Sequence, residues 1–316
     1  MASPARTTLR MPAKIAAPDL ASDLDLSQDE LLGLLDLSKS VKSNPTRYAR
    51  ALAGRYLALL FEKPSLRTRM TFELAIKQLG GDSVVNIGPI GDREPIKDVA
   101  RNLDRWTNAI VARTFSQQTI EELARWSNVP VINALSDLYH PCQALADIFT
   151  LQERFGDLRG LKLTFIGDGN NVAHSLMLSA ARMGMNFSIG CPKGYEPSAE
   201  IVREAEGLAA VSGSELNITN NAAEAVAGAH AVYTDVWASM GQEHEKQQRI
   251  QAFTPFQVNE ELFVQADPSA VFLHCLPAKR GEEVTDAVIE SPQSAVFDQA
   301  ENRLHVQKAL LLMLIS

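Results

Sequence analysis

The segment FEKPSLRTR, residues 61–69, places two hydroxyls and two guanidinium groups directly after an apolar run. Ser65, Arg67 and Thr68 fall at the predicted start of a helix, because apolar residues then recur at helical spacing up to a glycine pair at 80–81. A helix N-terminus offers free N–H groups and a positive dipole end, which with a guanidinium suit a phosphate dianion. The same pattern also suits a structural role, with Ser65 capping the helix and the arginines paired with acids.

Two further sets of side chains in the first half of the chain could bind a small polar ligand. His140 and Gln143 of HPCQALAD are three residues apart, so they share one face of the helix that this segment predicts. The alternative is a capping histidine and a solvated glutamine. Arg113 follows the apolar run AIVA and would lie at a strand end, where α/β proteins bind ligands. It could equally be a surface arginine.

The segment FIGDGNNVAHS in the second half suggests a dinucleotide site at first sight. Gly167 and Gly169 supply only GxG, because Val172 occupies the third glycine position and no clear acid ends the next strand. The fingerprint therefore fails, and a dehydrogenase function is disfavoured. A tight turn into a helix remains, where Asn170 and Asn171 could bind a carboxylate or cap the helix.

Two later strand ends carry the remaining candidates. Asp235 of AVYTDVWASMG could hold an ammonium group, with the Ser239-Met240-Gly loop beside it, or could form an Asx turn. Cys275 of AVFLHCLPA is either a small buried hydrophobe or a polar group at a strand end. No base stands beside it in the sequence, so a nucleophilic role is unsupported.

Short apolar runs alternating with amphipathic segments must position these residues, and they predict an α/β fold with buried parallel strands. The runs are 55–61, 83–87, 109–114, 129–135, 162–168, 187–191, 215–220, 231–237 and 270–277. Four precede residue 150 and five follow Gly160, with one long helix ending at Gly156 between them. We expect two doubly wound parallel-sheet domains of similar size joined by interdomain helices. The alternative, a barrel, needs eight evenly spaced units that are not evident.

The expected boundaries are a tail over residues 1–20, a first domain over 21–148 and a second over 149–302. The apolar end of the chain predicts a helix over 303–316 that docks back on the first domain. A capping box at Ser27 predicts a further helix start. The basic, acid-free first 18 residues faintly resemble a transit peptide, but no apolar signal core follows, which favours a loosely docked tail.

Composition restricts the function classes. The 316 residues are 46% hydrophobic and 22% charged, as in average globular chains, and carry a net charge of −8 without a Lys/Arg block. Nucleic-acid binding is therefore disfavoured. No apolar run approaches the ~20 residues that span a bilayer, so we expect a soluble protein. Three scattered cysteines without a CxxC pair favour a reducing, cytoplasmic compartment over a metal cluster.

Taken together, SLRTR, HPCQ, DVWASMG, HCLPA and ENR occur in one order along a two-half α/β chain. This arrangement resembles the carbamoyltransferase family from about residue 20 onward. DVWASMG and HCLP resemble its ornithine branch, because the aspartate branch lacks the Ser-Met-Gly loop. The resemblance implies transfer of a carbamoyl group from carbamoyl phosphate to the δ-amine of L-ornithine in arginine metabolism, without metal or cofactor. It also implies a homotrimer.

The resemblance implies roles residue by residue. Carbamoyl phosphate would be bound by Ser65, Leu66, Arg67, Thr68, Arg113, His140, Gln143 and Arg303. Ornithine would be bound by Asn171, Asp235, Ser239, Met240, Cys275 and Leu276. Arg113, His140 and Arg303 would polarise the carbamoyl carbonyl, Gln143 would bind its amino group, and Cys275 would line the path of the amine.

Two departures from the family pattern affect the predicted substrate. Leu66 stands where the family usually has Thr, which is similar to carbamoyltransferases for N-acylated ornithine, the main alternative function. The loop 87–98 lacks a Gln that related enzymes donate to a neighbouring subunit, and Arg93 or Glu94 is our hypothesis for its replacement. A non-catalytic relative that only binds carbamoyl phosphate is the non-enzymatic alternative.

Overall fold

The computed structural model describes residues 14–238 and 245–316. Two predicted site residues, Ser239 and Met240, lie outside the described residues, as do the first 13 residues of the predicted tail. None of the helices in the two described ranges is both long and apolar enough to cross a membrane.

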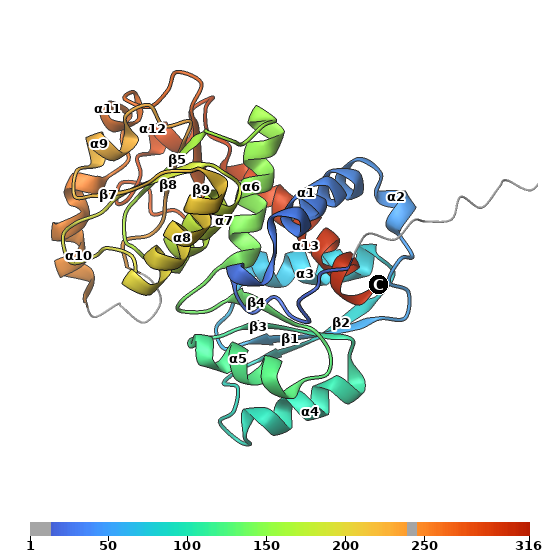
Figure 1. Ribbon diagram of the computed structural model, residues 1–316. Helices are drawn as coiled ribbons and strands as arrows, with labels where there is room; N and C mark the ends of the chain where they lie inside the picture. The colour runs from blue at the N-terminus through green and yellow to red at the C-terminus, as the bar shows by residue number, and fades with distance from the viewer. Residues whose placement is uncertain (1–13, 239–244) are drawn as a thin grey trace, which may run out of the picture.

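Two open sheets, each with all strands parallel, form the centres of the two halves (Figure 1). The first has the order β2-β1-β3-β4 and consists of β1 (Tyr56–Phe61), β2 (Asp82–Ile87), β3 (Ala109–Arg113) and β4 (Val131–Leu135). The second has the order β7-β6-β5-β8-β9 and consists of β5 (Lys162–Ile166), β6 (Asn186–Gly190), β7 (Leu216–Thr219), β8 (Ala231–Thr234) and β9 (Val271–His274). Every strand coincides with a predicted apolar run. The α/β class with two parallel sheets is confirmed, and the barrel is wrong.

Helices connect the strands and cover both sheets. Those of the first half are α1 (Gln28–Ser43), α2 (Pro45–Tyr48), α3 (Leu66–Gln78), α4 (Ile96–Trp106), α5 (Gln117–Trp126) and α6 (Pro141–Phe155). Those of the second half are α7 (Asn171–Arg182), α8 (Ala199–Ser212), α9 (Ala222–Val226), α10 (Lys246–Phe253), α11 (Glu260–Phe263) and α12 (Asp286–Ile289), before the final α13 (Val296–Ile315). Short 3-10 helices cover Asp23–Asp25 (η1) and Thr254–Phe256 (η3).

Strand β1 shows why continuous apolar runs form these sheets. Successive side chains point to opposite faces, so Leu57, Leu59 and Phe61 pack into the large core beneath α1, α3 and α13. Ala58 and Leu60 pack on the other face, in the cluster that contains residues of α4 and α5. Figure 1 shows α4 and α5 together on the outer side of this sheet. Both faces are buried, and the strand therefore has no polar alternation.

Two long helices lie between the halves, α6 in green and α13 in red in Figure 1. Helix α6 has Pro141 at its first turn and ends at Gly156, whose φ is +79°, as the sequence predicts. Helix α13 packs against α6, α1 and α3, so the chain end docks back on the first half. It begins at Val296 rather than near residue 303. The added turns hold buried polar residues that gave no apolar signal.

The chain before α1 lies against the first sheet. Leu20 is fully buried, and its backbone pairs with Val131 and Asn133 beside β4. Ser27 and Glu30 form the predicted capping box of α1. The N-terminal segment thereby reaches the junction between the halves, where η1 contacts α7.

Candidate active site

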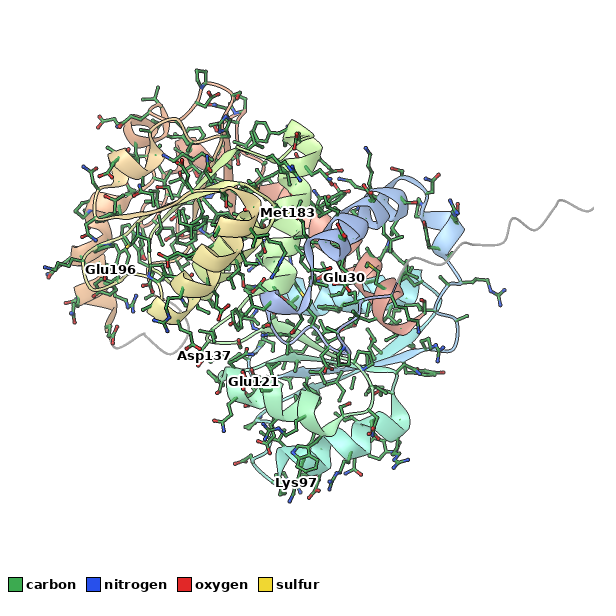
Figure 2. The ribbon with its side chains drawn as sticks, viewed as in Figure 1. Glu30, Lys97, Glu121, Asp137, Met183 and Glu196 are labelled. Atoms are coloured by element: carbon green, nitrogen blue, oxygen red, sulfur yellow. The ribbon has the colours of Figure 1, made fainter. Side chains whose placement is uncertain are left out.

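A cavity of about 1090 Å³ lies between the two halves, where the carboxyl ends of both sets of strands converge. The segments that follow β1, β3, β4, β5, β8 and β9 all contribute to its lining, as does Arg303 from α13. Asp137 and Glu196, labelled in Figure 2, line it from the first and the second half respectively. This is the position at which parallel α/β sheets bind ligands.

The turn after β1 forms one wall of the cavity. Ser65 is the N-cap residue of α3, but its side chain makes no capping bond and accepts from Arg113 Nη1 at 3.3 Å. Buried Thr68 accepts at its Oγ1 from Arg303 Nη2 at 2.6 Å. The turn is thus tied to two of the predicted arginines. Leu66, by contrast, is exposed and offers only its backbone.

Three guanidinium groups converge behind this turn. Burial, together with the nearby Arg303 and Arg67, lowers the pKa of Arg113 to about 10. Burial likewise lowers the pKa of Arg67 and of Arg303. All three remain charged at neutral pH, but holding them together in a partly desolvated site is costly. A bound dianion would offset this repulsion, and the wall is therefore suited to a phosphate.

His140 lies beside these arginines at the start of α6. Its backbone N–H donates to Ser175 Oγ of α7 at 2.8 Å, which fixes the residue between the two halves. Burial and the charges of Arg303, Arg113 and Arg67 lower the pKa of His140 well below its ordinary value. The imidazole is therefore neutral at pH 7. A neutral ring can donate one N–H to a carbonyl oxygen without adding a fourth charge.

Gln143, which the resemblance assigns to carbamoyl phosphate, does not line the cavity. It lies one turn into α6, where its Oε1 accepts from Arg303 Nη1 at 3.0 Å. Its Nε2 donates to Asp147 Oδ1 at 2.8 Å. The side chain is 1% exposed and is neither solvated nor free to reach into the cavity in this arrangement. The direct role that we observe for Gln143 is to orient Arg303.

The opposite wall carries the second cluster of predicted residues. Asp235, just after β8, accepts from Cys275 Sγ at 3.1 Å and from Asn170 Nδ2 at 3.2 Å. Burial, followed by the adjacent carboxylate, raises the pKa of the Cys275 thiol well above its ordinary value. Cys275 is therefore a thiol donor rather than a thiolate nucleophile. The carboxylate of Asp235 faces the cavity, where an ammonium group can approach it.

Asn171 and Leu276 complete this wall. Asn171, the first residue of α7, donates its Nδ2 to the Ser136 carbonyl of the first half at 2.6 Å. Leu276 has φ +57° and its N–H donates to His274 Nδ1 at 2.9 Å, which shapes the turn after β9. The other imidazole nitrogen of His274 lies 3.3 Å from buried Glu283. The backbone of this turn is thus fixed from behind.

Sequence reasoning missed a buried ion pair at the edge of the cavity. Asp168 follows β5, and its Oδ2 accepts from Arg249 Nη1 of α10 at 2.8 Å. The same Nη1 lies 3.0 Å from the Trp237 carbonyl. Asp168 follows a strand, as Asp235 does, so its place at a strand end could have identified it in the sequence. Arg249 also pairs with Glu245 one turn earlier, but nothing near it in the sequence indicates Asp168, which lies 81 residues before it.

Within residues 14–238 and 245–316, one group of side chains could supply metal ligands. Asp235, His274 and Cys275 offer donor atoms within 4.8 Å of one another. Both ring nitrogens of His274 are already engaged, by Leu276 N–H and by Glu283. A metal would have to break one of these bonds and displace the thiol proton of Cys275. The donor set therefore fits a hydrogen-bonded turn better than a metal centre.

The structure brings most of the predicted site residues to one cavity. Its lining includes Ser65, Leu66, Arg67, Thr68, Arg113, His140, Asn171, Asp235, Cys275, Leu276 and Arg303. Arg93 and Glu94 are exposed and absent from the lining formed by this chain. Any contact of theirs with a substrate would have to be made in another copy.

Comparisons with known proteins cover the two halves separately. Residues 19–153 match the aspartate/ornithine carbamoyltransferase carbamoyl-P binding domain. Residues 159–314 match the aspartate/ornithine carbamoyltransferase Asp/Orn binding domain. The first match contains the wall formed around the Ser65–Thr68 turn, and the second contains the wall formed around Asp235.

Three individual proteins illustrate the similarity. The ornithine carbamoyltransferase of a Synechococcus species is 50% identical over 304 residues, 95% of this chain and 98% of its own. The structure of ornithine carbamoyltransferase from Pyrococcus furiosus is 45% identical, with a TM-score of 0.93 over 96% of this chain and 98% of that one. An acetylornithine transcarbamylase complexed with acetylcitrulline is 36% identical, with a TM-score of 0.86 over 94% and 99%. The chain therefore belongs to the aspartate/ornithine carbamoyltransferase family.

Proposed function

We propose that this enzyme transfers the carbamoyl group of carbamoyl phosphate to the δ-amine of L-ornithine, giving L-citrulline and phosphate. The observation that carries the proposal is the pairing of two walls in one cavity. Arg67, Arg113 and Arg303 provide a site for a dianion, and Asp235 with Cys275 faces them from the second half. Carbamoyl phosphate and an amino acid require these two kinds of wall.

On the donor side, the phosphate would occupy the Ser65–Thr68 turn. Backbone N–H groups at the start of α3 and the guanidinium of Arg67 would bind its oxygens. Arg113 already donates to Ser65 of this turn, and its charge also acts on His140. The exposed Leu66 removes a hydroxyl that related turns have but leaves the N–H group in place.

The chemical step forms a carbon–nitrogen bond and breaks a carbon–oxygen bond. The neutral δ-amine attacks the carbamoyl carbon, and negative charge develops on the carbonyl oxygen of the tetrahedral intermediate. Arg113, Arg303 and the neutral ring of His140 would stabilise that oxygen, as in an oxyanion hole. The intermediate then expels phosphate, which accepts the proton lost by the amine. A mixed anhydride has a good leaving group, so the proposed step uses no metal or organic cofactor.

The acceptor must bind as its neutral amine. An alkyl amine with a pKa near ~10.4 is almost entirely protonated at pH 7, so the site must select or generate the free base. The unionised Cys275 thiol fits this requirement, because it borders the amine path without adding a negative charge that would favour the ammonium form. Asp235 would bind the α-ammonium group, and Asn171 would help to hold the same α-amino acid end of ornithine.

An N-acylated ornithine is the second candidate acceptor. It is favoured by Leu66 in the phosphate turn and by the similarity to an acetylornithine transcarbamylase. Asp235 opposes it, because an acyl amide carries no charge and would leave this carboxylate poorly paired. A relative that only binds carbamoyl phosphate would not need the carbonyl-polarising groups, all of which are present.

Acceptor identity is tested by supplying carbamoyl phosphate with L-ornithine, N-acetyl-L-ornithine or L-aspartate and measuring each carbamoylated product. We expect kcat/KM for ornithine to exceed the other two by at least about a hundredfold, since burying the Asp235 carboxylate without a cationic partner is costly. Faster turnover of acetylornithine would replace the first candidate by the second. No product from any acceptor would refute catalysis.

We further propose a homotrimer that acts in the cytoplasm in arginine biosynthesis. An apolar stripe on α3, formed by Leu66, Met70 and Leu74, is 70, 51 and 42% exposed. On the edge strand β2, Ile87 is also exposed, at 48%, and it lies on the sheet face that α3 covers because it pairs with Phe61. Exposed apolar surface of this kind is typical of an interface. The three cysteines are free thiols, which suits a reducing compartment.

A further inference from the structure

A buried chain of hydrogen bonds begins at the phosphate turn and leaves the cavity through Arg303. The guanidinium donates from Nη2 to Thr68 Oγ1 at 2.6 Å and from Nη1 to Gln143 Oε1 at 3.0 Å. Gln143 Nε2 then donates to Asp147 Oδ1 at 2.8 Å. The orientation of a donor-side cation is therefore set by a carboxylate that does not touch the cavity.

The chain continues from Asp147 into the acceptor half. Gln299 of α13 donates its Nε2 to the same Asp147 Oδ1 at 2.6 Å and to the Tyr233 hydroxyl of β8 at 3.2 Å. Its Oε1 accepts from the backbone N–H of His274 at 2.9 Å. His274 precedes Cys275 and fixes the following turn through Leu276. The network thus ends directly beneath the acceptor wall.

Because this network is buried, the loss of any one of its hydrogen bonds costs free energy. Asp147 is completely buried, and Gln143 and Gln299 are each 1% exposed, so no solvent water can replace a lost partner. Each side chain has few satisfactory orientations, and a change in one member leaves another unpaired at a cost of about 1–3 kcal/mol. The position of Arg303 and the positions of Gln143, Asp147 and Gln299 therefore depend on one another.

We propose that Asp147 and Gln299 are positioning residues that couple the two walls of the cavity, holding Arg303 and the turn after β9 in one hydrogen-bonded frame. The inference rests on the proposed function and adds to it a physical connection between donor and acceptor binding. Such coupling is reciprocal, so the binding of each ligand lowers the Kd of the other by the same factor.

The factor by which one ligand lowers the Kd of the other is measured by calorimetry with two unreactive substrate analogues. Phosphonoacetamide replaces the bridging oxygen of carbamoyl phosphate by a methylene, and L-norvaline lacks the δ-amine of ornithine. The ratio of norvaline Kd values without and with saturating phosphonoacetamide should be about fivefold or more in the unmodified protein. In Gln299→Met we expect this ratio to fall at least threefold, with the Kd of phosphonoacetamide alone changed less than twofold.

Two further variants make the test specific. Gln299→Glu keeps the acceptor for His274 N–H but loses the donor to Asp147, so its ratio should also fall. Asn302→Leu is the matched control, because Asn302 is equally buried on α13 and bonds Thr150 of α6 at 3.0 Å outside the network. Asn302→Leu should lower the Tm of the protein but leave the ratio of norvaline Kd values unchanged.

Four results would overturn the inference. A ratio near one in the unmodified protein excludes coupling, and an unchanged ratio in the folded Gln299 variants excludes this route for it. An equal fall in the Asn302→Leu control would indicate general loosening between α6 and α13. If the unmodified protein binds neither probe, the proposed function fails as well, which separates that failure from the others.

Discussion

At the scale of residues, the same side-chain types acquire different roles from their surroundings. His140, beside three guanidinium groups, is held neutral, whereas His274 uses both ring nitrogens to shape a turn. Cys275 stays protonated because it is buried next to Asp235. The reactive qualities of the site therefore come from neighbours that the folded chain supplies, and each can be tested by substitution.

Because Arg67 and Cys275 lie on different walls of the cavity, we expect Arg67 to affect the binding of carbamoyl phosphate and Cys275 to affect the binding of ornithine. Arg67→Gln should raise KM for carbamoyl phosphate by about 10- to 100-fold, the value of a charge-assisted hydrogen bond, with little change in norvaline affinity. Cys275→Ala should mainly raise KM for ornithine. Steady-state kinetics with each substrate varied in turn measures both. Equal losses for both substrates in both variants would contradict the assignment.

His140 should contribute to the rate without titrating in the working range. Because its pKa is well below the ordinary value, the ring is neutral from pH 6 to 8 and acts as a constant hydrogen-bond donor. His140→Ala should lower kcat by about 10²- to 10³-fold, as for other oxyanion donors. A pH–rate profile is the check. Loss of an inflection between pH 6 and 7 in the variant would contradict a neutral His140.

At the scale of elements, turns at strand ends position the site and impose local constraints. The GDGN turn after β5 failed as a dinucleotide fingerprint, and the structure gives its second glycine another function. A Cβ on Gly169 would lie 2.2 Å from Pro197 N, because the loop before α8 packs directly on this turn. The Gly169 N–H also donates to the Tyr195 carbonyl at 2.8 Å.

Gly169→Ala should therefore displace the turn that carries Asp168 and Asn171. We expect a loss of about 1–3 kcal/mol in stability from overpacking, together with a higher KM for ornithine. Gly207→Ala is the matched control, since Gly207 lies in α8 with nothing within 4 Å of the added methyl. That change should stabilise the helix by up to about 1 kcal/mol. Equal Tm values for the two variants would refute the steric argument.

The contact between η1 and α7 predicts a pH-dependent stability. Burial raises the pKa of Asp23 to about 7, although it accepts from Ser175 and lies near Arg182. Between pH 4 and 7 the folded chain keeps a proton that the unfolded chain has released. This contribution to stability is therefore complete at low pH and is lost as pH rises towards 7, at up to about 1.4 kcal/mol per pH unit.

Asp23→Asn removes this titration, because an amide has no proton to lose in that range. The urea midpoint of the variant relative to the unmodified protein should rise steadily from pH 5 to pH 7 and then level off. Comparing the two proteins at each pH cancels the opposing contributions of histidines and surface acids. A constant difference across the range would contradict the assigned pKa of Asp23.

At the scale of the whole molecule, the sequence predicted the strands well because most are short apolar runs buried on both faces, whereas the edge strands β2 and β7 are largely exposed. It also located Asp235 and Arg113, because parallel strands bring their carboxyl ends to one edge. It could not predict that Gln143 lies behind Arg303, or that Gln299 begins a buried network in α13. Those arrangements depend on partners up to 160 residues away, and polar letters such as those of 296–303 give no sign of burial.

The apolar stripe on α3 predicts self-association of the whole molecule. Sedimentation equilibrium should give about three times the chain mass of 34.5 kDa, and Met70→Glu should shift the mass towards one chain by placing a charge in the interface. Val211→Glu is the control, because Val211 is 88% exposed on α8, away from the stripe. A single-chain mass for the unmodified protein would refute the homotrimer.

The bond formed in the proposed reaction provides the most direct test of the central claim. Carbamoyl phosphate labelled with ¹³C and L-ornithine labelled with ¹⁵N at the δ position are incubated with the protein and followed by ¹³C NMR. The account predicts a carbonyl signal split by one-bond coupling to ¹⁵N, growing in step with released phosphate. Label that appears only as bicarbonate, or as an unsplit carbonyl on the α-nitrogen, would contradict carbamoyl transfer to the δ-amine.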